Sequence, residues 1–224
     1  MNKEACIVIP TYKTYSKLSS FEQKSLLNTQ KVFTNYDVWI VCPEGLNLQG
    51  YIDKGIEKFK VFDKKRFQGI EAYNELMLQS FFYESFKTYR YMLIAQLDCF
   101  IFSNQLAYFC GLNYDYIGSL HTTPHTGNKL INGNGGFSLR NINSFIKASK
   151  NIKKKDLNGR KDWEDILYSY WYKNKMNIAP DEVALKFGWQ QRPEECFAKN
   201  GNSLPFGCHK PFVFNYNGFW KKYL

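Results

Sequence analysis

The run YMLIAQLDCFIF, residues 91–102, decides the fold of this chain. Its length and its aliphatic and aromatic content are typical of a buried strand. Inside it stands one carboxylate, Asp98, with Gln96 two residues earlier. Because a buried charge is costly unless another group pairs with it, we expect Asp98 to hold a partner or a ligand.

Strand-like and helix-like runs alternate on both sides of this stretch. Short β-branched or aromatic runs predict strands, and apolar residues three and four apart predict helices. The expected strands are residues 5–9, 36–42, 58–62, 91–102 and 114–118, and the expected helices are residues 17–33 and 69–89. This alternation is typical of an α/β fold, and we predict a mostly parallel central sheet flanked by helices.

Length and composition are those of one compact domain. The chain has 224 residues, 44% of them hydrophobic, and no internal repeat, so we expect a single domain spanning residues 1–224. Six cysteines are scattered without a CxxC pair, which favours reduced thiols over a disulfide framework or a zinc site. The short apolar run before Pro10 and the lack of a long apolar segment predict a cytoplasmic protein.

The chain is basic. Its 30 lysines and arginines against 20 acidic residues give a net charge of +10. This charge favours phosphate-bearing partners such as nucleotides, nucleic acid or an anionic membrane surface, although lysine-rich proteomes also contain basic proteins without such partners. Because the basic residues are spread along the chain, we do not expect nucleic acid as a partner.

Polar residues stand at the ends of three expected strands. Thr11 and Tyr12 come directly after Pro10, Glu44 follows the second strand, and Asp98 belongs to the fourth. In an open α/β sheet, ligands bind at the carboxyl ends of the strands. We therefore expect these side chains to meet at one cleft, although each alone could be an ordinary turn residue.

Three stretches of the second half carry candidate functional groups, each with an ordinary alternative. Residues 132–140, NGNGGFSLR, are rich in glycine, so the backbone can approach a ligand, but Asn-Gly is also a hairpin signal. Residues 162–165, DWED, open a helix, where acidic residues usually serve as caps and complement the helix dipole. His209, within the loop of residues 205–211, could be a ligand or simply an exposed histidine.

Eight short motifs occur in order between Ala5 and His209: PTYK, VCPEG, YNELM, QLDCFIF, YDYIG, NGNGGFSLR, WED and PFGCH. Together they resemble a family of small bacterial and fungal domains classed as glycosyltransferase-like, with a nucleotide-sugar transferase fold of the GT-A type. The resemblance implies one GT-A-like domain, with a nucleotide-sugar donor half in residues 1–118 and an acceptor and catalytic half in residues 119–224.

The resemblance implies a donor site at the strand ends. Enzymes of the GT-A type usually hold Mn²⁺ or Mg²⁺ with an Asp-x-Asp, but Gln96 replaces the first acid here and Phe100 stands two residues after Asp98, so one carboxylate remains. A dication needs several ligands, and PFGCH resembles the position from which a histidine near the C-terminus binds the metal in several such enzymes. Asp98 and His209 are therefore the expected metal ligands, with Mn²⁺ preferred to Mg²⁺. The implied donor-binding residues are Pro10, Thr11, Tyr12, Glu44, Asn74, Gln96 and Asp98.

The WED motif resembles the acidic pair at the acceptor side of inverting transferases. On that basis Asp165 is the expected catalytic base, which would remove the proton of the acceptor hydroxyl, and Glu164 would position acceptor hydroxyls. The residues expected to flank the acceptor or the transferred sugar are Asn134, Gly135, Gly136, Phe137 and Trp163.

The resemblance implies a cytoplasmic glycosyltransferase that uses a uridine-linked nucleotide sugar and modifies a glycan, glycoconjugate or lipid-linked acceptor in surface-polysaccharide assembly. Two alternatives stay open: a metal-dependent nucleotidyl- or phosphotransferase on the same scaffold, and a non-catalytic module that binds an anionic glycan or nucleic acid. The C-terminal residues 218–224, GFWKKYL, could make a peripheral contact with the inner face of the membrane, or could pack on the domain or fray.

Overall fold

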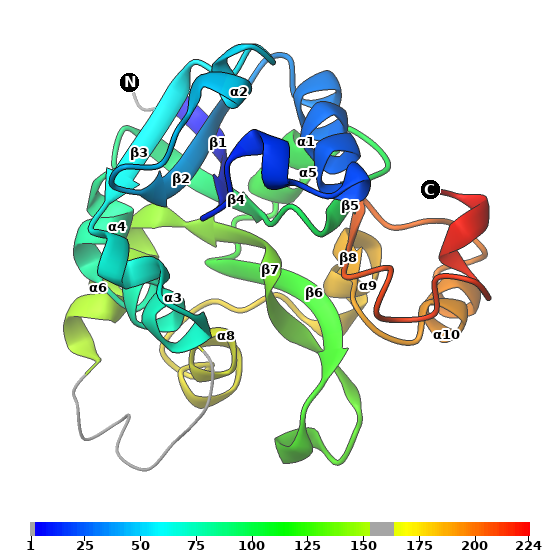
Figure 1. The fold of residues 1–224 in the computed structure, drawn as a ribbon. Coiled ribbons are helices and arrows are strands. Elements are labelled where there is room, and N and C mark those ends of the chain that lie inside the picture. The colour runs from blue at the N-terminus through cyan, green and yellow to red at the C-terminus, as the bar shows by residue number, and fades with distance from the viewer. Residues whose placement is uncertain (1–2, 153–163) are drawn as a thin grey trace.

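The computed structural model describes residues 3–152 and 164–224 (Figure 1). Within these residues nine strands form one sheet in the order β3-β2-β1-β4-β7-β6-β8-β9-β5. The strands are β1 (Lys3–Pro10), β2 (Asp37–Pro43), β3 (Lys58–Phe62), β4 (Tyr89–Ala95), β5 (Cys99–Ile101), β6 (Tyr116–Thr122), β7 (Leu130–Asn141), β8 (Gly188–Trp189) and β9 (Gly207–His209).

Helices cover the sheet on both faces. The α-helices of the described residues are α1 (Ser20–Val32), α2 (Gln49–Ile52), α3 (Ile70–Met77), α4 (Ser80–Glu84), α5 (Leu106–Gly111), α6 (Ile142–Asn151), α8 (Glu164–Ile166), α9 (Asp181–Phe187) and α10 (Pro193–Lys199). Short 3₁₀ turns occur at Tyr15–Lys17, Lys64–Phe67, Pro124–Thr126 and Trp220–Lys222, and a π-helix at Leu167–Trp171 follows α8.

Strand β1 is buried on both of its faces. Its side chains alternate between two core clusters: Ile7 and Ile9 pack in the cluster that includes residues of α1, α2, α5 and α9, whereas Cys6 and Val8 pack in the cluster of α3, α4 and α6. A central parallel strand that is covered on both faces has no polar side to present, which explains the uninterrupted apolar run of residues 5–9.

The sheet is mixed. Strands β3, β2, β1 and β4 run parallel, as predicted. Beyond β4 the direction changes, because β7 pairs antiparallel with both β4 and β6, and β5 pairs antiparallel with β9. The predicted mostly parallel sheet therefore describes the first four strands, whereas the whole is a single α/β domain with a mixed nine-stranded sheet.

The predicted strand of residues 91–102 is two strands joined by a turn. Strand β4 ends at Ala95 and β5 begins at Cys99, and the turn between them is closed by a 2.9 Å hydrogen bond from the Cys99 N–H to the carbonyl of Gln96. The two strands also have different partners, β7 and β9. Asp98 therefore lies in a turn at the end of a strand.

The predicted helix of residues 69–89 is also divided. Helix α3 ends at Met77 and α4 begins at Ser80, because Gln79 between them adopts an extended conformation. The break leaves the buried pairs Leu76 and Met77, and Phe82 and Tyr83, in the same core cluster.

The C-terminal segment packs on the domain. Phe219 and Trp220 are buried in a third core cluster with Trp189, and the ring of Trp220 stacks on Phe102. These two aromatic side chains are thus used inside the protein, whereas Lys221 and Lys222 are exposed. In the described ranges we find no helix with the length and apolar content needed to cross a membrane.

The cysteines are all unpaired. Each of the six is buried. For Cys6, Cys42, Cys99, Cys110, Cys196 and Cys208, burial raises the pKa of the thiol above its ordinary value. The predicted free thiols are present, and burial keeps them protonated.

Candidate active site

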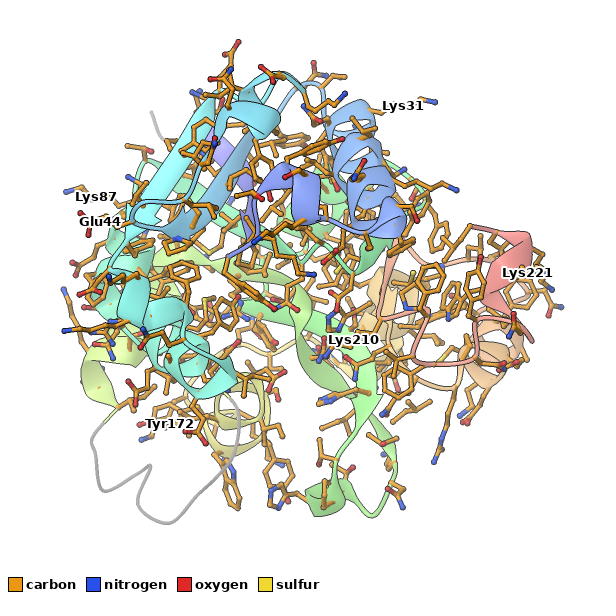
Figure 2. The ribbon with its side chains drawn as sticks, viewed as in Figure 1. Lys31, Glu44, Lys87, Tyr172, Lys210 and Lys221 are labelled. Carbon is orange, nitrogen blue, oxygen red and sulfur yellow. The ribbon has the colours of Figure 1, made fainter. Side chains whose placement is uncertain are left out.

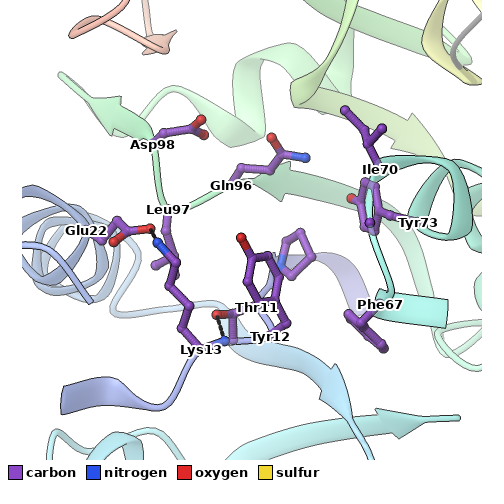
Figure 3. Close-up of a pocket in the computed structure, with 12 residues that line it drawn as sticks. Thr11, Tyr12, Lys13, Glu22, Phe67, Ile70, Tyr73, Gln96, Leu97 and Asp98 are labelled. Atoms are coloured by element: carbon purple, nitrogen blue, oxygen red, sulfur yellow. Dashed lines mark hydrogen bonds and ion pairs between the residues drawn. The ribbon is translucent and has the colours of Figure 1, made fainter. Parts of the chain in front are cut away.

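A cavity of about 580 Å³ opens at the carboxyl ends of β1 and β4 (Figure 3). Its lining comes from residues 10–13 after β1, Glu22 of α1, the Gln96–Asp98 turn, and Phe67, Gly69, Ile70 and Tyr73 beside and within α3. The cavity therefore lies where the predicted cleft was expected.

Five of the seven predicted donor-binding residues line this cavity, namely Pro10, Thr11, Tyr12, Gln96 and Asp98. Tyr12 is 65% exposed, so its ring is available to a ligand. The Thr11 side chain is buried, and its hydroxyl accepts the N–H of Lys13 at 3.1 Å. Thr11 thus shapes the loop that forms the cavity wall.

Glu44 and Asn74 are not among the lining residues, so the structure does not bring these two predicted donor-binding residues to this cavity. Glu44 is exposed on the turn after β2, and its N–H bonds to the carbonyl of Phe62 (Figure 2). Gly45 follows with a positive φ of 80°, which turns the chain at that point. The Asn74 side chain instead accepts the backbone N–H of Glu164 at 3.4 Å.

Asp98, Gln96 and His209 form a polar cluster at the rim of the cavity. The Nε2 atom of His209 lies 3.1 Å from Asp98 Oδ1 and 3.1 Å from Gln96 Oε1. The antiparallel pairing of β5 with β9, which sets Cys99 opposite His209, brings these residues together. Gln190 bonds to the other imidazole nitrogen, Nδ1, at 2.7 Å and so fixes the ring.

Neighbouring residues change the pKa of the Asp98 carboxyl. Burial raises its pKa, but the close polar contact with His209 and the charges of His209 and Lys210 bring the pKa below its ordinary value. The side chain is 40% exposed. Asp98 is therefore ionised at neutral pH and accessible from the cavity.

This cluster has atoms that suit a divalent cation. Asp98 Oδ1 is shielded from solvent and makes no hydrogen bond of good geometry with any described residue. With Gln96 Oε1 and His209 Nε2 it forms a set of oxygen and nitrogen atoms, which fits Mn²⁺ better than Mg²⁺. The Cys99 sulfur also lies within 4.8 Å of the Asp98 and His209 ligand atoms. Burial raises the pKa of that thiol well above its ordinary value, so it remains protonated and is a poor ligand.

The glycine run of β7 forms a wide bulge beside this cluster. On β6, Gly118 pairs with Ser138 and the next residue, Ser119, pairs with Asn134, so residues 135–137 have no partner on β6. The carbonyl of Gly136 accepts the Gln96 N–H at 2.9 Å. The bulge thus carries the backbone of β7 against the Gln96–Asp98 turn.

Both glycines are required by the side chains packed on them. A Cβ on Gly136 would lie 2.3 Å from His209 Nε2, and a Cβ on Gly135 would lie 2.7 Å from Glu164 Oε1. The space that the glycines leave is therefore filled by the protein itself. This packing gives another reason for the two glycines than their predicted place beside the acceptor or the transferred sugar.

Glu164 forms a buried ion pair with Arg140. The two carboxylate oxygens lie 3.0 and 3.2 Å from the two terminal nitrogens of Arg140, and both residues are almost completely buried. Arg140 also donates to the Ser138 hydroxyl, the Tyr83 hydroxyl and the Gly135 carbonyl. Each oxygen of Glu164 accepts a hydrogen bond from Arg140, so the structure places Glu164 in a buried ion pair, and its predicted positioning of acceptor hydroxyls stays a prediction.

Asp165 is held against the same bulge. Its Oδ2 accepts the Gly135 N–H at 2.9 Å and the Asn134 amide at 3.4 Å, and its Oδ1 accepts the Ile166 N–H at 2.8 Å. A carboxylate has about four lone-pair sites, so one hydrogen-bond position stays open for a further proton donor. The structure thus brings Asp165 and Asn134 together at the bulge.

Asp165 and the cluster of Asp98, Gln96 and His209 lie against neighbouring residues of the bulge. Asp165 contacts Gly135, and His209 contacts the position next to it, Gly136. The pKa of His121 on β6 lies below its ordinary value, because burial and the charge of His209 lower it and the charge of Asp165 raises it by less. Its Nε2 atom has no hydrogen-bond partner within the described part of the chain.

Two predicted aromatic contacts differ in outcome. Phe137 is fully buried, with its ring 4.9 Å from Phe187 and 5.3 Å from Phe206, so it belongs to the core and its predicted contact with a sugar is wrong. The inward direction follows from the pairing of Phe137 with Ala95 on β4. Trp163 lies outside the described residues.

Arg140 and Gln190 were not predicted as parts of the site. Arg140 is the last residue but one of β7. Because side chains alternate along a strand, a charged residue directly after an apolar one is expected to be exposed. Gln190 follows β8, whose two residues carry no strand signal. In both cases the partner comes from a distant part of the chain.

Comparisons with known proteins agree with the fold. A family model described as "Protein of unknown function (DUF5672)" matches residues 57–209. No curated protein sequence matches the chain.

Similar solved structures are glycosyltransferases. The apo form of GlyE from Streptococcus pneumoniae TIGR4 has a TM-score of 0.55 at 12% identity, over 93% of this chain and 54% of GlyE. A second GlyE structure has a TM-score of 0.55 at 11% identity, over 94% and 55% of the two chains. A glycosyltransferase involved in the glycosylation of the major capsid of PBCV-1 has a TM-score of 0.50 at 10% identity, over 92% of each chain. This chain thus spans about half of GlyE and nearly all of the viral enzyme, and it has a glycosyltransferase-like fold.

Proposed function

The chain belongs to the family DUF5672, and we propose that it is a glycosyltransferase that moves a sugar from a nucleoside-diphosphate sugar to a hydroxyl of a glycan or glycoconjugate. The observation that carries this proposal is the cluster at the cavity rim, where Asp98 Oδ1 and Gln96 Oε1 each lie 3.1 Å from His209 Nε2. The similarity in fold to GlyE and to the PBCV-1 enzyme supports it. A uridine-linked donor and a role in surface-polysaccharide assembly are finer parts of the same proposal.

The cavity would hold the donor. The exposed ring of Tyr12 offers a flat apolar surface for a base, and the Asp98 cluster lies at the end where a diphosphate would be placed. Asp98 and His209, with the Gln96 amide oxygen, would hold Mn²⁺, which when bound would offset the charge of the leaving diphosphate.

Asp165 would act as the general base. It is fixed to the bulge by the Gly135 N–H and has one hydrogen-bond position open. An acceptor hydroxyl that donates to this position would lose its proton to Asp165 as its oxygen attacks the anomeric carbon and the bond to the diphosphate breaks. This single in-line displacement inverts the anomeric centre, so the proposal predicts a product of inverted configuration.

The test is a donor-hydrolysis screen. The full chain is incubated with a panel of uridine, guanosine, thymidine and cytidine diphosphate sugars, with and without Mn²⁺, and the released nucleoside diphosphate is measured. We expect release from one donor class and loss of release in Asp98→Ala. If no donor is hydrolysed while nucleotides are transferred to a phosphate or alcohol acceptor, the chain is a nucleotidyltransferase. If no donor is turned over and an anionic glycan binds, it is a binding module.

A further inference from the structure

An ion pair lies inside the cavity that the Asp98 cluster also lines. The ammonium nitrogen of Lys13 is 2.7 Å from Glu22 Oε1, and both residues line the cavity (Figure 3). The Lys13 side chain is 34% exposed and that of Glu22 is 17% exposed. The pair is thus open to a ligand that enters the cavity.

Glu22 is the fixed member of the pair. Its second oxygen, Oε2, accepts the Ser19 N–H at 2.8 Å, and the Ser19 hydroxyl accepts the Glu22 N–H in return, which is the capping box of α1. Burial raises the pKa of Glu22, but the Lys13 hydrogen bond and the Ser19 contacts bring it below its ordinary value. Glu22 therefore keeps its charge and its place.

Lys13 is fixed at its backbone and free at its tip. The Lys13 N–H donates to the Thr11 hydroxyl at 3.1 Å, and its carbonyl accepts the Tyr51 hydroxyl at 2.8 Å. The ammonium at the end of the flexible stem has three donors and one carboxylate partner. Rotation about the stem can thus move the charge without moving the loop.

The charges of the cavity oppose an anion as long as this pair is closed. Among its lining residues are two carboxylates, Glu22 and Asp98, and one cation, Lys13. A phosphate group that enters meets a net negative lining, and the cation of that lining, Lys13, is already paired with Glu22. The pKa of Lys13 is raised above its ordinary value by its hydrogen bond to Glu22 and, to a smaller extent, by the charges of Glu22 and Asp98, so both carboxylates favour the charged ammonium.

We propose that Lys13 and Glu22 form an exchangeable ion pair, in which the ammonium of Lys13 leaves Glu22 to bind a phosphate of the ligand. Because Glu22 competes with the ligand for this ammonium, it lowers the affinity of the cavity for phosphate compounds. The chemical class of the ligand is a diphosphate. Its identification as the diphosphate of a sugar donor rests on the proposed function, whereas the exchange itself does not.

The experiment is a double-mutant cycle with inorganic pyrophosphate as the probe, measured by isothermal titration calorimetry with and without Mn²⁺. Glu22→Gln keeps an acceptor for the capping box and removes the charge. We expect it to tighten pyrophosphate binding by about two- to fivefold, the range of a partly exposed ion pair. Lys13→Met should weaken binding. In the Lys13→Met background, Glu22→Gln should tighten binding by a smaller factor, because no ion pair is left to break.

A matched control uses an ion pair of the same length outside the cavity. Lys199 and Glu195 of α10 are also 2.7 Å apart, and Glu195→Gln should leave pyrophosphate affinity unchanged. Weaker binding in Glu22→Gln would overturn the proposal, since Glu22 would then hold Lys13 in its binding position. An equal or larger tightening in the Lys13→Met background would also overturn the proposal, because simple repulsion between Glu22 and pyrophosphate would explain it. The proposal also fails if pyrophosphate does not bind either with or without Mn²⁺. Donor hydrolysis is scored separately, so either proposal can fail alone.

Discussion

The two aspartates of the site occupy opposite kinds of surroundings. Asp98 lies in a turn at the cavity rim, is 40% exposed, and carries an oxygen without a good hydrogen bond. Asp165 lies behind the bulge, is 8% exposed, and accepts three hydrogen bonds from fixed groups. At the rim, Asp98 thus has an oxygen that a ligand can bind. At the buried bulge, most of the hydrogen-bond positions of Asp165 are taken by the groups that hold it in place.

This difference indicates that one set of residues determines ligand binding and another determines the stability of the fold. The buried ion pair of Arg140 and Glu164 supports Asp165 through the Gly135 backbone, which Arg140 bonds at its carbonyl and Asp165 at its N–H. Such a network costs stability when one member is removed, because the others are left buried without partners. Substitutions at the rim should mainly change ligand binding, and substitutions in the network should mainly change folding.

The largest expected effect is that of Asp165→Asn on turnover. Asparagine keeps the size of the side chain but cannot accept the proton of the acceptor, so kcat for donor hydrolysis should fall by about two to four orders of magnitude while nucleotide affinity stays within about twofold. Steady-state kinetics and calorimetric titration of the nucleoside diphosphate give the two numbers. An equal loss of nucleotide affinity would move Asp165 to the donor side of the site.

Removal of Arg140 should strongly reduce the free energy of unfolding. Arg140→Met leaves Glu164 charged and buried, and we expect a loss of about 3–5 kcal/mol, measured by urea denaturation. The control is Arg192→Met, which breaks an exposed ion pair with Glu195 and should cost less than about 1 kcal/mol. The addition of Glu164→Gln to Arg140→Met should restore part of the stability, and no restoration would mean that the loss comes from the other Arg140 contacts.

His209→Ala should raise the Mn²⁺ requirement. Loss of one of few ligands should increase the Mn²⁺ concentration for half-maximal hydrolysis by at least about tenfold, the loss seen when even an outer-shell partner of a metal site is removed. His125→Ala, on the exposed turn before β7, is the matched control and should have no effect. Activity of the unaltered chain that persists after complete chelation would show that His209 acts without a metal.

A carboxylate remote from the cavity should make stability depend on pH. Asp37, on β2, is surrounded by Lys3, Tyr89 and Lys58. Burial raises its pKa, but its bonds to Lys3 and Tyr89 and the charge of Lys58 bring the pKa below the ordinary value of 3.8. Its stabilising contribution is therefore complete above that ordinary value and is lost as the pH falls through the lower pKa of the folded state.

Thermal unfolding of Asp37→Asn checks this pH dependence. The variant should be less stable than the unaltered chain at pH 6, and the difference in Tm should shrink as the pH is lowered below about 3.8. A difference that stays constant over this range would mean that the charge of Asp37 contributes nothing.

The smallest expected effect belongs to Glu44. Because this side chain is exposed and does not line the cavity, Glu44→Gln should change neither nucleotide affinity nor stability by more than about 0.5 kcal/mol. A tenfold loss of nucleotide affinity would bring back the predicted contact with the base and would require the turn after β2 to move on ligand binding.

Local patterns predicted the first half of the fold well. The strand of residues 58–62 has the predicted bounds, and β1 and β2 differ from prediction only at their ends. The run of β1 is recognisable because burial on both faces leaves it continuously apolar, whereas β3, at the edge of the sheet, is recognisable by the alternation of KFKVF. The family resemblance agreed with the glycosyltransferase-like fold that the solved structures share.

The parts that could not be predicted depend on partners far along the chain. The break between β4 and β5 arises because β5 pairs with β9, more than a hundred residues later, and nothing in the run of residues 91–102 records that partner. Arg140 is buried because Glu164, Tyr83 and Gly135 together accept its donors. The proximity of Asp98 and His209 was predicted only through the resemblance, whereas the structure places Glu44 outside the cavity lining and Phe137 in the core.

The free, buried thiols can report local unfolding of the segments that contain them. Because a protonated and covered thiol cannot react, alkylation of each cysteine requires the segment that contains it to unfold at least transiently. Pulsed alkylation with mass spectrometry would therefore rank local opening across the molecule without any engineered label. The sequence supplies one probe in each of six elements: Cys6 in β1, Cys42 in β2, Cys99 in β5, Cys110 in α5, Cys196 in α10 and Cys208 in β9.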